Sequence, residues 1–152
     1  MSLDEEVKLL RRIPLFANIE PSKLKLLAFT SERLAYEAGQ ELFHQGDVGD
    51  AAYVIIEGEA SVLVDSPAGA IEVATLSGND IVGEISILCD VPRTATVRAR
   101  TRLVTLKITK DLFFRLVKEF PQMAVEIMRE LARRLDRTTG QLQAAVSRTK
   151  ER

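Results

Sequence analysis

The spacing of apolar residues changes twice along this chain, and that change limits its fold more than any other feature. From about residue 32 to 108, short runs rich in β-branched and aromatic residues alternate with turn residues. The runs are ELFHQ, AAYVIIEG, ASVLVDS, IEVATLS, TATVRAR and LVTLKIT. Strand-length segments at intervals of roughly 8–12 residues, with turn signals between them, predict an all-β roll or sandwich. Gly58-Glu59 predicts a tight turn within it, and Pro67-Ala68-Gly69 predicts a hairpin tip.

Helical spacing precedes and follows this β section. The run LDEEVKLLRRI has acidic residues in its first turn and basic residues in its last, which complements a helix dipole. Pro14 would end this helix, and Pro21 would begin the next one. After residue 110, DLFFRLVKEF predicts a short amphipathic helix and the segment 121–146 a longer one.

We therefore expect a single domain over residues 1–152, a length that suits one hydrophobic core. Its expected parts are N-terminal helices at 1–30, a β-roll at 31–108 and C-terminal helices at 109–148.

Composition argues against several classes of function. The chain has 21 basic and 22 acidic residues and a formal net charge of −1, which does not indicate a nucleic-acid-binding surface. One cysteine, Cys89, allows no internal disulfide, and one histidine, His44, cannot build a cupin-type metal centre. The N-terminus lacks the order of a signal peptide, and no apolar run approaches the ~18 residues of a membrane span. These features predict a cytoplasmic protein with no membrane partner.

Residues 82–97, VGEISILCDVPRTATV, carry the strongest functional pattern. Gly83 permits close backbone approach, and GEISIL predicts a helical turn whose first N–H groups attract an anion. Arg93 follows with a guanidinium fork that suits phosphate, and Pro92 fixes the chain just before it. Glu84, at the helix start, can accept hydrogen bonds from a sugar hydroxyl. The segment offers an anion cradle, a phosphate clamp and a ribose acceptor, without an obvious nucleophile or metal ligand.

This segment resembles the phosphate-binding cassette of cyclic-nucleotide-binding domains. The family pattern of Gly-Glu, a small apolar helix and Pro-Arg-small-Ala-Ser/Thr is complete here as Gly83-Glu84-Ile85-Ser86 and Pro92-Arg93-Thr94-Ala95-Thr96. The run from Gly46 to Asp50, and the segment Tyr53 to Gly58, also match the family. The resemblance implies a mainly β fold with flanking helices, in which a jelly-roll-like β-roll carries the cassette. It implies a non-catalytic sensor of cAMP or a close relative, with no other cofactor.

The resemblance also implies a role for each cassette residue. Arg93 would pair with the cyclic phosphate, and Glu84 would bind the ribose 2′-hydroxyl. Backbone N–H groups would face the phosphate oxygens, and the Thr94 hydroxyl would add a donor. The remaining ligand-binding positions are Val82, Gly83, Ile85, Ser86 and Ala95. A surface ion pair between Glu84 and Arg93 is the plain structural alternative. Asp50 resembles the acid that orients this arginine in kinase regulatory subunits. The alternative is that Asp50 only caps a turn.

The last predicted helix carries an apolar stripe with a period of 3.5 residues. Its members are Ala124, Met128, Leu131, Leu135, Thr138, Leu142 and Ala145. Such a stripe lets a helix pair with another, so we expect a homodimer; packing on the chain's own roll is the alternative. The helix also resembles the dimerisation helix of the Crp/Fnr (catabolite activator protein) family. That resemblance places Thr138 and Thr139 against the adenine, which favours cAMP, whereas Thr94 is typical of relatives that prefer cGMP.

The leading hypothesis is a free-standing cyclic-nucleotide receptor in which ligand binding repositions the C-terminal helix and which binds no nucleic acid by itself. Its alternative is the effector-sensing half of a Crp/Fnr-type transcription regulator whose DNA-binding domain is absent from this chain. A β-roll that has lost its ligand is a third hypothesis, which the complete cassette opposes. An enzyme is least expected, because the sequence shows no acid–base pair, metal cluster or nucleophile constellation.

Overall fold

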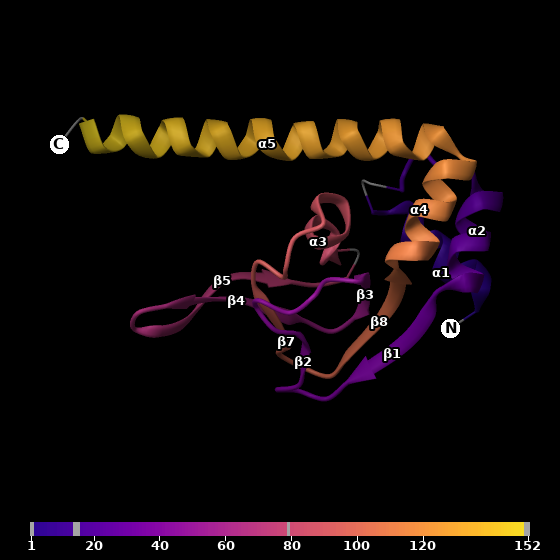
Figure 1. Cartoon of the computed structure of the whole chain (residues 1–152), viewed down its shortest axis with the longest axis horizontal. Coiled ribbons are helices and arrows are strands. Elements are labelled where there is room, and N and C mark those ends of the chain that lie inside the picture. Colours follow the sequence, from indigo (N-terminus) through magenta and orange to yellow (C-terminus); the bar gives the residue numbers. More distant parts are fainter. Residues whose placement is uncertain (1, 14–15, 79, 151–152) are drawn as a thin grey trace.

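The structure, a computed structural model, describes residues 2–13, 16–78 and 80–150, with the backbone alone at 85, 127, 130, 134, 137, 138, 141, 142 and 144–150. It is mainly antiparallel β-sheet with flanking helices, as predicted (Figure 1). The helices are α1 (Leu3–Arg11), α2 (Pro21–Thr30), α3 (Glu84–Cys89), α4 (Lys110–Glu119) and α5 (Pro121–Lys150). The strands are β1 (Glu32–Tyr36), β2 (Glu41–Phe43), β3 (Ala51–Glu57), β4 (Ala60–Ser66), β5 (Gly69–Leu76), β6 (Ile81–Val82), β7 (Thr96–Ala99) and β8 (Leu103–Thr109).

Two four-stranded antiparallel sheets form the roll. One has the strand order β1-β8-β3-β6, and the other has the order β2-β7-β4-β5. Strand β3 is buried from Ala51 to Ile56 because both of its faces are covered. Ala51, Tyr53 and Ile55 face the core between the sheets, whereas Ala52, Val54 and Ile56 face a second core that the helices build on the outside. A strand buried on both faces needs a continuous apolar run, which is what AAYVII supplies.

The N-terminal helices begin where the sequence predicts. Ser2 caps α1 by accepting a hydrogen bond from the Glu5 N–H at 3.2 Å, and the first and last turns of α1 carry the expected acidic and basic residues. Pro21 is the first residue of α2. The predicted helix break at Pro14 lies outside the described residues.

The predicted turns are also present. Gly58 has a φ of 90°, and a β-carbon there would overlap the carbonyl oxygen of Arg102, so this turn requires glycine. Strands β4 and β5 pair down to Ser66 opposite Gly69, which makes Pro67 and Ala68 the hairpin tip.

Two predictions need correction. The list of apolar runs omitted β1, an edge strand with no fully buried residue, because a half-exposed edge carries little hydrophobic pattern. The last helix extends beyond Val146 to Lys150. In Figure 1, α5 runs across the molecule above α3, away from the N-terminal helices. None of the described helices is long and apolar enough to cross a membrane.

Candidate functional site

The predicted cassette follows the order β6, α3, β7, and its central turn depends on a glycine. Gly83 has a φ of 88° and precedes α3, with no side-chain cap at that position. A β-carbon on Gly83 would lie 2.5 Å from Arg93 Nη1 and 3.1 Å from the Ala51 carbonyl oxygen. Glycine therefore lets the start of α3 lie directly against the arginine. The first N–H groups of α3 have no acceptor within the helix itself.

Arg93 is buried in the centre of the site and is only 4% exposed. Its Nη1 donates to the Gly83 carbonyl at 3.1 Å, and its Nη2 donates to the Ala51 carbonyl at 2.7 Å. The guanidinium lies over the ring of Phe43, with Cζ 4.0 Å from the ring centroid. Its Nε is buried and has no hydrogen-bond partner among the described residues. A buried N–H of a cation that lacks an acceptor is costly, and it marks a position where an anion would be stabilised.

Burial lowers the pKa of Arg93 from its ordinary value, and the negative charges of Asp50, Asp47 and Glu84 act in the opposite direction. An arginine stays protonated even so, because its ordinary pKa lies far above neutral. Glu84 is itself only 8% exposed. Neither Glu84 nor Arg93 therefore lies on the surface, which opposes the surface ion pair considered as an alternative.

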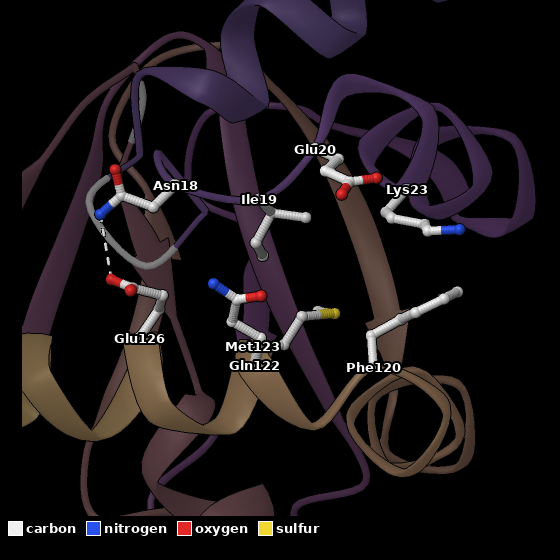
Figure 2. Close-up of a pocket in the computed structure, with 8 residues that line it drawn as sticks. All are labelled: Asn18, Ile19, Glu20, Lys23, Phe120, Gln122, Met123 and Glu126. Carbon is white, nitrogen blue, oxygen red and sulfur yellow. Dashed lines mark hydrogen bonds between the residues drawn. The ribbon is translucent and has the colours of Figure 1, made fainter.

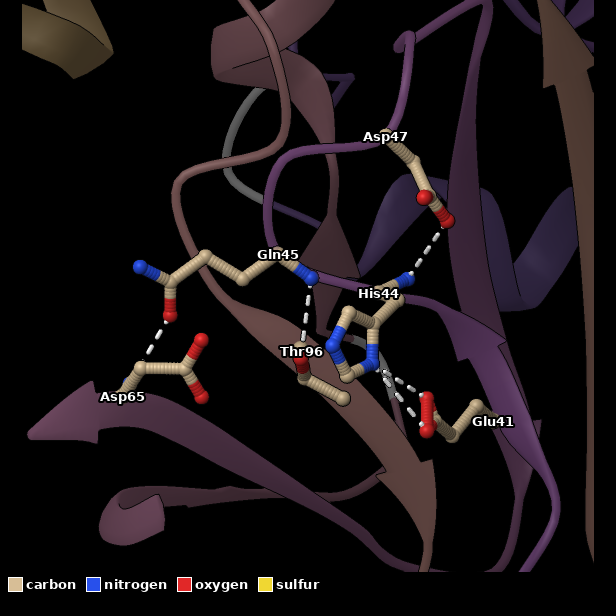
Figure 3. A network of polar contacts seen from close by, with 6 residues as sticks. All are labelled: Glu41, His44, Gln45, Asp47, Asp65 and Thr96. Atoms are coloured by element: carbon tan, nitrogen blue, oxygen red, sulfur yellow. Dashed lines mark hydrogen bonds and ion pairs between the residues drawn. The ribbon is translucent and has the colours of Figure 1, made fainter. Parts of the chain in front are cut away.

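A short loop is fastened against the backbone around Arg93. The Arg93 N–H donates to the Asp47 carbonyl at 2.8 Å, and the Gly46 N–H donates to the Arg93 carbonyl at 2.9 Å. The Gln45 N–H donates to Thr96 Oγ1 at 2.8 Å. Figure 3 shows that last contact together with the side chain of Asp47, which accepts a hydrogen bond from the N–H of His44 at 3.0 Å. These bonds join the loop after β2 to the start of β7 and fix the position of the arginine backbone.

The same loop touches the start of α3. A β-carbon on Gly49 would overlap that of Ser86, which is 3% exposed, and would lie 3.3 Å from Arg93 Cζ. Beside this contact lies a hollow of about 200 Å³, lined by Val48, Gly49, Asp90, Val91 and Pro92. The structure therefore brings the Gly46–Asp50 run and the cassette, which the sequence identified separately, into one site.

The other predicted residues occupy varied environments. Val82 and Ala95 are half-buried, and Thr94 is exposed beside Arg93. Asp50 is exposed, and its carbonyl accepts a hydrogen bond from the Lys110 N–H at 2.8 Å. Thr139 is exposed on α5. The side chains of Ile85 and Thr138 lie outside the described residues.

Sequence reasoning missed three parts of this site. Phe43 lies under the guanidinium, Gly49 permits the contact with Ser86, and the Ala51 carbonyl accepts from Arg93. Gly49 had a signal, because it belongs to the GDVGD run that matches the family. Phe43 and Ala51 had none, because an aromatic or small residue in a strand predicts only a place in the core.

A second cavity, of about 150 Å³, lies between the N-terminal segment and the start of α5 (Figure 2). Asn18 donates to Glu126 Oε2 across this cavity at 3.0 Å, and Arg129 donates to Glu126 Oε1 at 3.2 Å. Lys23 lies over the ring of Phe120, with Nζ 4.2 Å from the centroid. The contacts of Asn18 with Glu126 and of Lys23 with Phe120 attach the start of α5 to the N-terminal part of the chain.

Comparison with known proteins agrees with this geometry. Residues 33–120 match the family model of the cyclic nucleotide-binding domain. The chain is 29% identical over 136 residues to a CRP-like cAMP-activated global transcriptional regulator of Mycobacterium tuberculosis, covering 89% of this chain and 61% of that protein. It is 35% identical over 109 residues to a cAMP-dependent protein kinase regulatory subunit of Blastocladiella emersonii, covering 71% of this chain and 27% of that protein. The chain thus spans less than two thirds of either relative.

Among solved structures, the N-terminal domain of a transcriptional regulator from Streptomyces coelicolor A3(2) is similar, with a TM-score of 0.75 and 34% sequence identity. The likeness covers 86% of this chain and 94% of that one.

Proposed function

Because the chain belongs to the cyclic nucleotide-binding domain family, we propose that it is a sensor whose ligand is cAMP, with cGMP as the weaker ligand. The family and the relatives described above are regulatory, so the chain is a regulatory, non-catalytic domain. Both relatives are named for cAMP, which supports that choice of ligand.

One observation carries the proposal. The guanidinium of Arg93 is buried against the start of α3, and its Nε has no acceptor among the described residues. A cyclic phosphate there would accept from Nε and from the first N–H groups of α3, together with those of Thr94 and Ala95. Glu84 would hold the ribose 2′-hydroxyl, and Val82, Gly83, Ile85 and Ser86 would complete the wall of the site. The charge of Asp50 supports the protonated arginine.

Calorimetric titration of cAMP and cGMP into the full chain tests this proposal. Arg93→Ala should weaken binding at least ~10-fold, because one charge-assisted hydrogen bond contributes roughly 1.5–3 kcal/mol. Arg93→Lys should recover only part of the loss, since an ammonium cannot reproduce the fork. Arg98→Ala, which removes an exposed arginine from β7, is the matched control and should bind as the wild type does. Equal affinity in Arg93→Ala and wild type would contradict the proposal.

Ligand binding would act by shifting α5 relative to the cassette. The first turns of α5 are attached through Asn18 and Glu126, whereas Leu135, farther along, is 68% exposed. A helix attached at one end can change its angle at low cost. Cys89 is exposed at the end of α3. Spin labels on Cys89 and on the new cysteine of an Ala132→Cys variant would report the distance between α3 and α5. With unlabelled protein in excess, cAMP should shift the distance distribution; an unchanged distribution would contradict the movement.

The chain would form a homodimer through α5. It would act in the cytoplasm, and by itself it would bind no DNA. Met128 and Leu135 of the apolar stripe are 61% and 68% exposed, which supports a second copy as the partner of that stripe. The net charge of −1 opposes DNA binding. Sequence-specific, salt-sensitive binding of the isolated chain to duplex DNA would overturn that part of the proposal.

A second candidate function is the effector-sensing half of a longer transcription regulator. It is favoured by the M. tuberculosis regulator, of which this chain matches 61%, and by the solved N-terminal domain from S. coelicolor. Reading the genomic frame past residue 152 for a DNA-binding domain distinguishes the two functions.

A further inference from the structure

We propose that Phe43 is a positioning residue for the phosphate-binding arginine: its ring holds the Arg93 guanidinium in the plane that presents Nε to the ligand. This inference rests on the proposed function, because it explains how the phosphate group of a cyclic nucleotide would find a preformed donor.

An irregularity in β2 turns Phe43 towards the arginine. Glu41 pairs with Arg98 and Phe43 pairs with Val97, so β2 advances two residues while β7 advances one. In a regular strand, neighbouring side chains point to opposite faces. Here Leu42 is buried in the core between the sheets, and Phe43 packs against that same core. The extra residue thus allows two consecutive apolar side chains to face inward, which is how a bulge redirects a side chain.

The ring and the cassette enclose the guanidinium together. Arg93 Cζ lies 4.0 Å from the centroid of Phe43, and a β-carbon on Gly83 would lie 3.3 Å from Phe43 Cε2 and 2.5 Å from Arg93 Nη1. The Gly83 and Ala51 carbonyls accept from Nη1 and Nη2 respectively. One face of the guanidinium and one N–H of each terminal nitrogen are therefore occupied, and Nε is the nitrogen without a partner among the described residues.

The ring itself has firm support. Phe43 packs on Tyr53 with 5.9 Å between ring centroids and 33° between the ring planes. Tyr53 is 6% exposed, and the pKa of Tyr36 is raised to about 12, chiefly by burial and then by its interaction with Tyr53. An aromatic ring packed on a second, buried ring is a firm surface for a cation to stack on.

This arrangement would increase affinity by ordering the arginine before the ligand arrives. Arginine has a long, flexible side chain, and fixing it during binding would oppose association. A stacking contact of the usual strength corresponds to a change of roughly 3- to 30-fold in an equilibrium constant. We therefore expect Phe43→Leu, which keeps an apolar side chain but removes the ring, to weaken cAMP binding by about that factor.

The test is a double-mutant cycle in the full chain, with cAMP titrated by calorimetry. Phe43→Leu should weaken binding in the wild-type background and have little effect in the Arg93→Ala background, where there is no guanidinium to position. Phe43→Tyr keeps the ring and should restore most of the affinity. Phe114→Leu, which removes a half-exposed ring from α4, is the matched control and should not change binding. An equal loss from Phe43→Leu in both backgrounds would overturn the proposal while leaving the proposed function intact.

A second measurement uses the ligand-free wild-type protein, so it does not depend on whether any variant folds. The NMR order parameter of the Arg93 Nε–H in ligand-free wild type should match that of rigid backbone, and its proton should show the ring-current shift of a group over an aromatic face. A disordered Nε–H would overturn the role of Phe43. Failure of wild type to bind any cyclic nucleotide, with an ordered Nε–H, would instead reject the proposed function alone.

Discussion

Gly49 and Ser86 are in direct contact, although 36 positions separate them in the sequence. A β-carbon on Gly49 would overlap the Ser86 Cβ and lie 2.8 Å from its Oγ. Gly49 has no positive φ, so its requirement for glycine is purely steric. Through this contact the loop before β3 sets the position of the start of α3.

Gly49→Ala should therefore destabilise the protein and weaken cyclic-nucleotide binding. Forcing a methyl group into a packed contact costs about 1–3 kcal/mol, which urea unfolding would measure. Gly78→Ala is the control, because a β-carbon there would meet the Ile56 carbonyl at an ordinary 3.5 Å. Its stability should stay within about 0.5 kcal/mol of the wild type. If Gly49→Ala keeps wild-type stability and affinity, the loop can move away from Ser86 without affecting the fold or the site, and the prediction is wrong.

Leu135→Glu should convert the proposed dimer to a monomer without unfolding it. Leu135 is 68% exposed within one chain, so a charge there disturbs only an interface with another molecule. Leu131 is a poorer choice because it packs against the chain's own core. Phe29→Glu, at a 77% exposed site on α2, is the control and should leave the molecular mass unchanged. Light scattering that finds monomeric wild type at micromolar concentration would exclude the dimer.

Replacing Thr138 and Thr139 together by alanine should narrow the preference for cAMP over cGMP. Adenine has an exocyclic amine that a threonine hydroxyl can accept from, whereas guanine has a carbonyl at that position. One neutral hydrogen bond contributes about 1 kcal/mol, so the wild-type preference should be roughly fivefold. Competition titrations with both nucleotides measure it. Tighter binding of cGMP by the wild type would indicate that Thr94, through the guanine amine, sets the ligand choice.

His44 should titrate above the ordinary value for histidine. Its Nδ1 lies 2.9 Å from the Glu41 carboxylate, which favours the charged imidazolium and raises the pKa of His44. With a folded pKa above the unfolded one, this pair stabilises the fold below about pH 6.5, and the effect is lost as pH rises through the folded value. NMR titration of the chain's one histidine should show the raised pKa.

Glu41→Gln should return the midpoint of that titration towards 6.5. Asp65→Asn should lower it by less, because the charge of Asp65 is a minor contribution to the shift. An unshifted midpoint in wild type would mean that solvent screens the exposed pair completely.

The sequence by itself determined the fold class and the chemistry of the cassette, because both depend on local pattern. Short runs rich in β-branched and aromatic residues, with turn residues between them, predict strands whatever their partners, so most of the roll was predictable. Gly83 and Arg93 could be identified because a tight helix start and a guanidinium fork are properties of single residues. Strand β1 was missed, since an edge strand with one exposed face gives a weak pattern.

Tertiary structure alone decided what surrounds Arg93. Phe43, Ala51 and Gly49 reach it from β2, from β3 and from the loop between them, and these contacts depend on the pairing of β2 with β7 and on the irregularity within it. Strand register is set by the whole sheet and by the packing of its core, so no window of sequence contains it. The burial that leaves Nε of Arg93 without a partner among the described residues has the same origin, because residues distant in sequence together exclude water from that nitrogen.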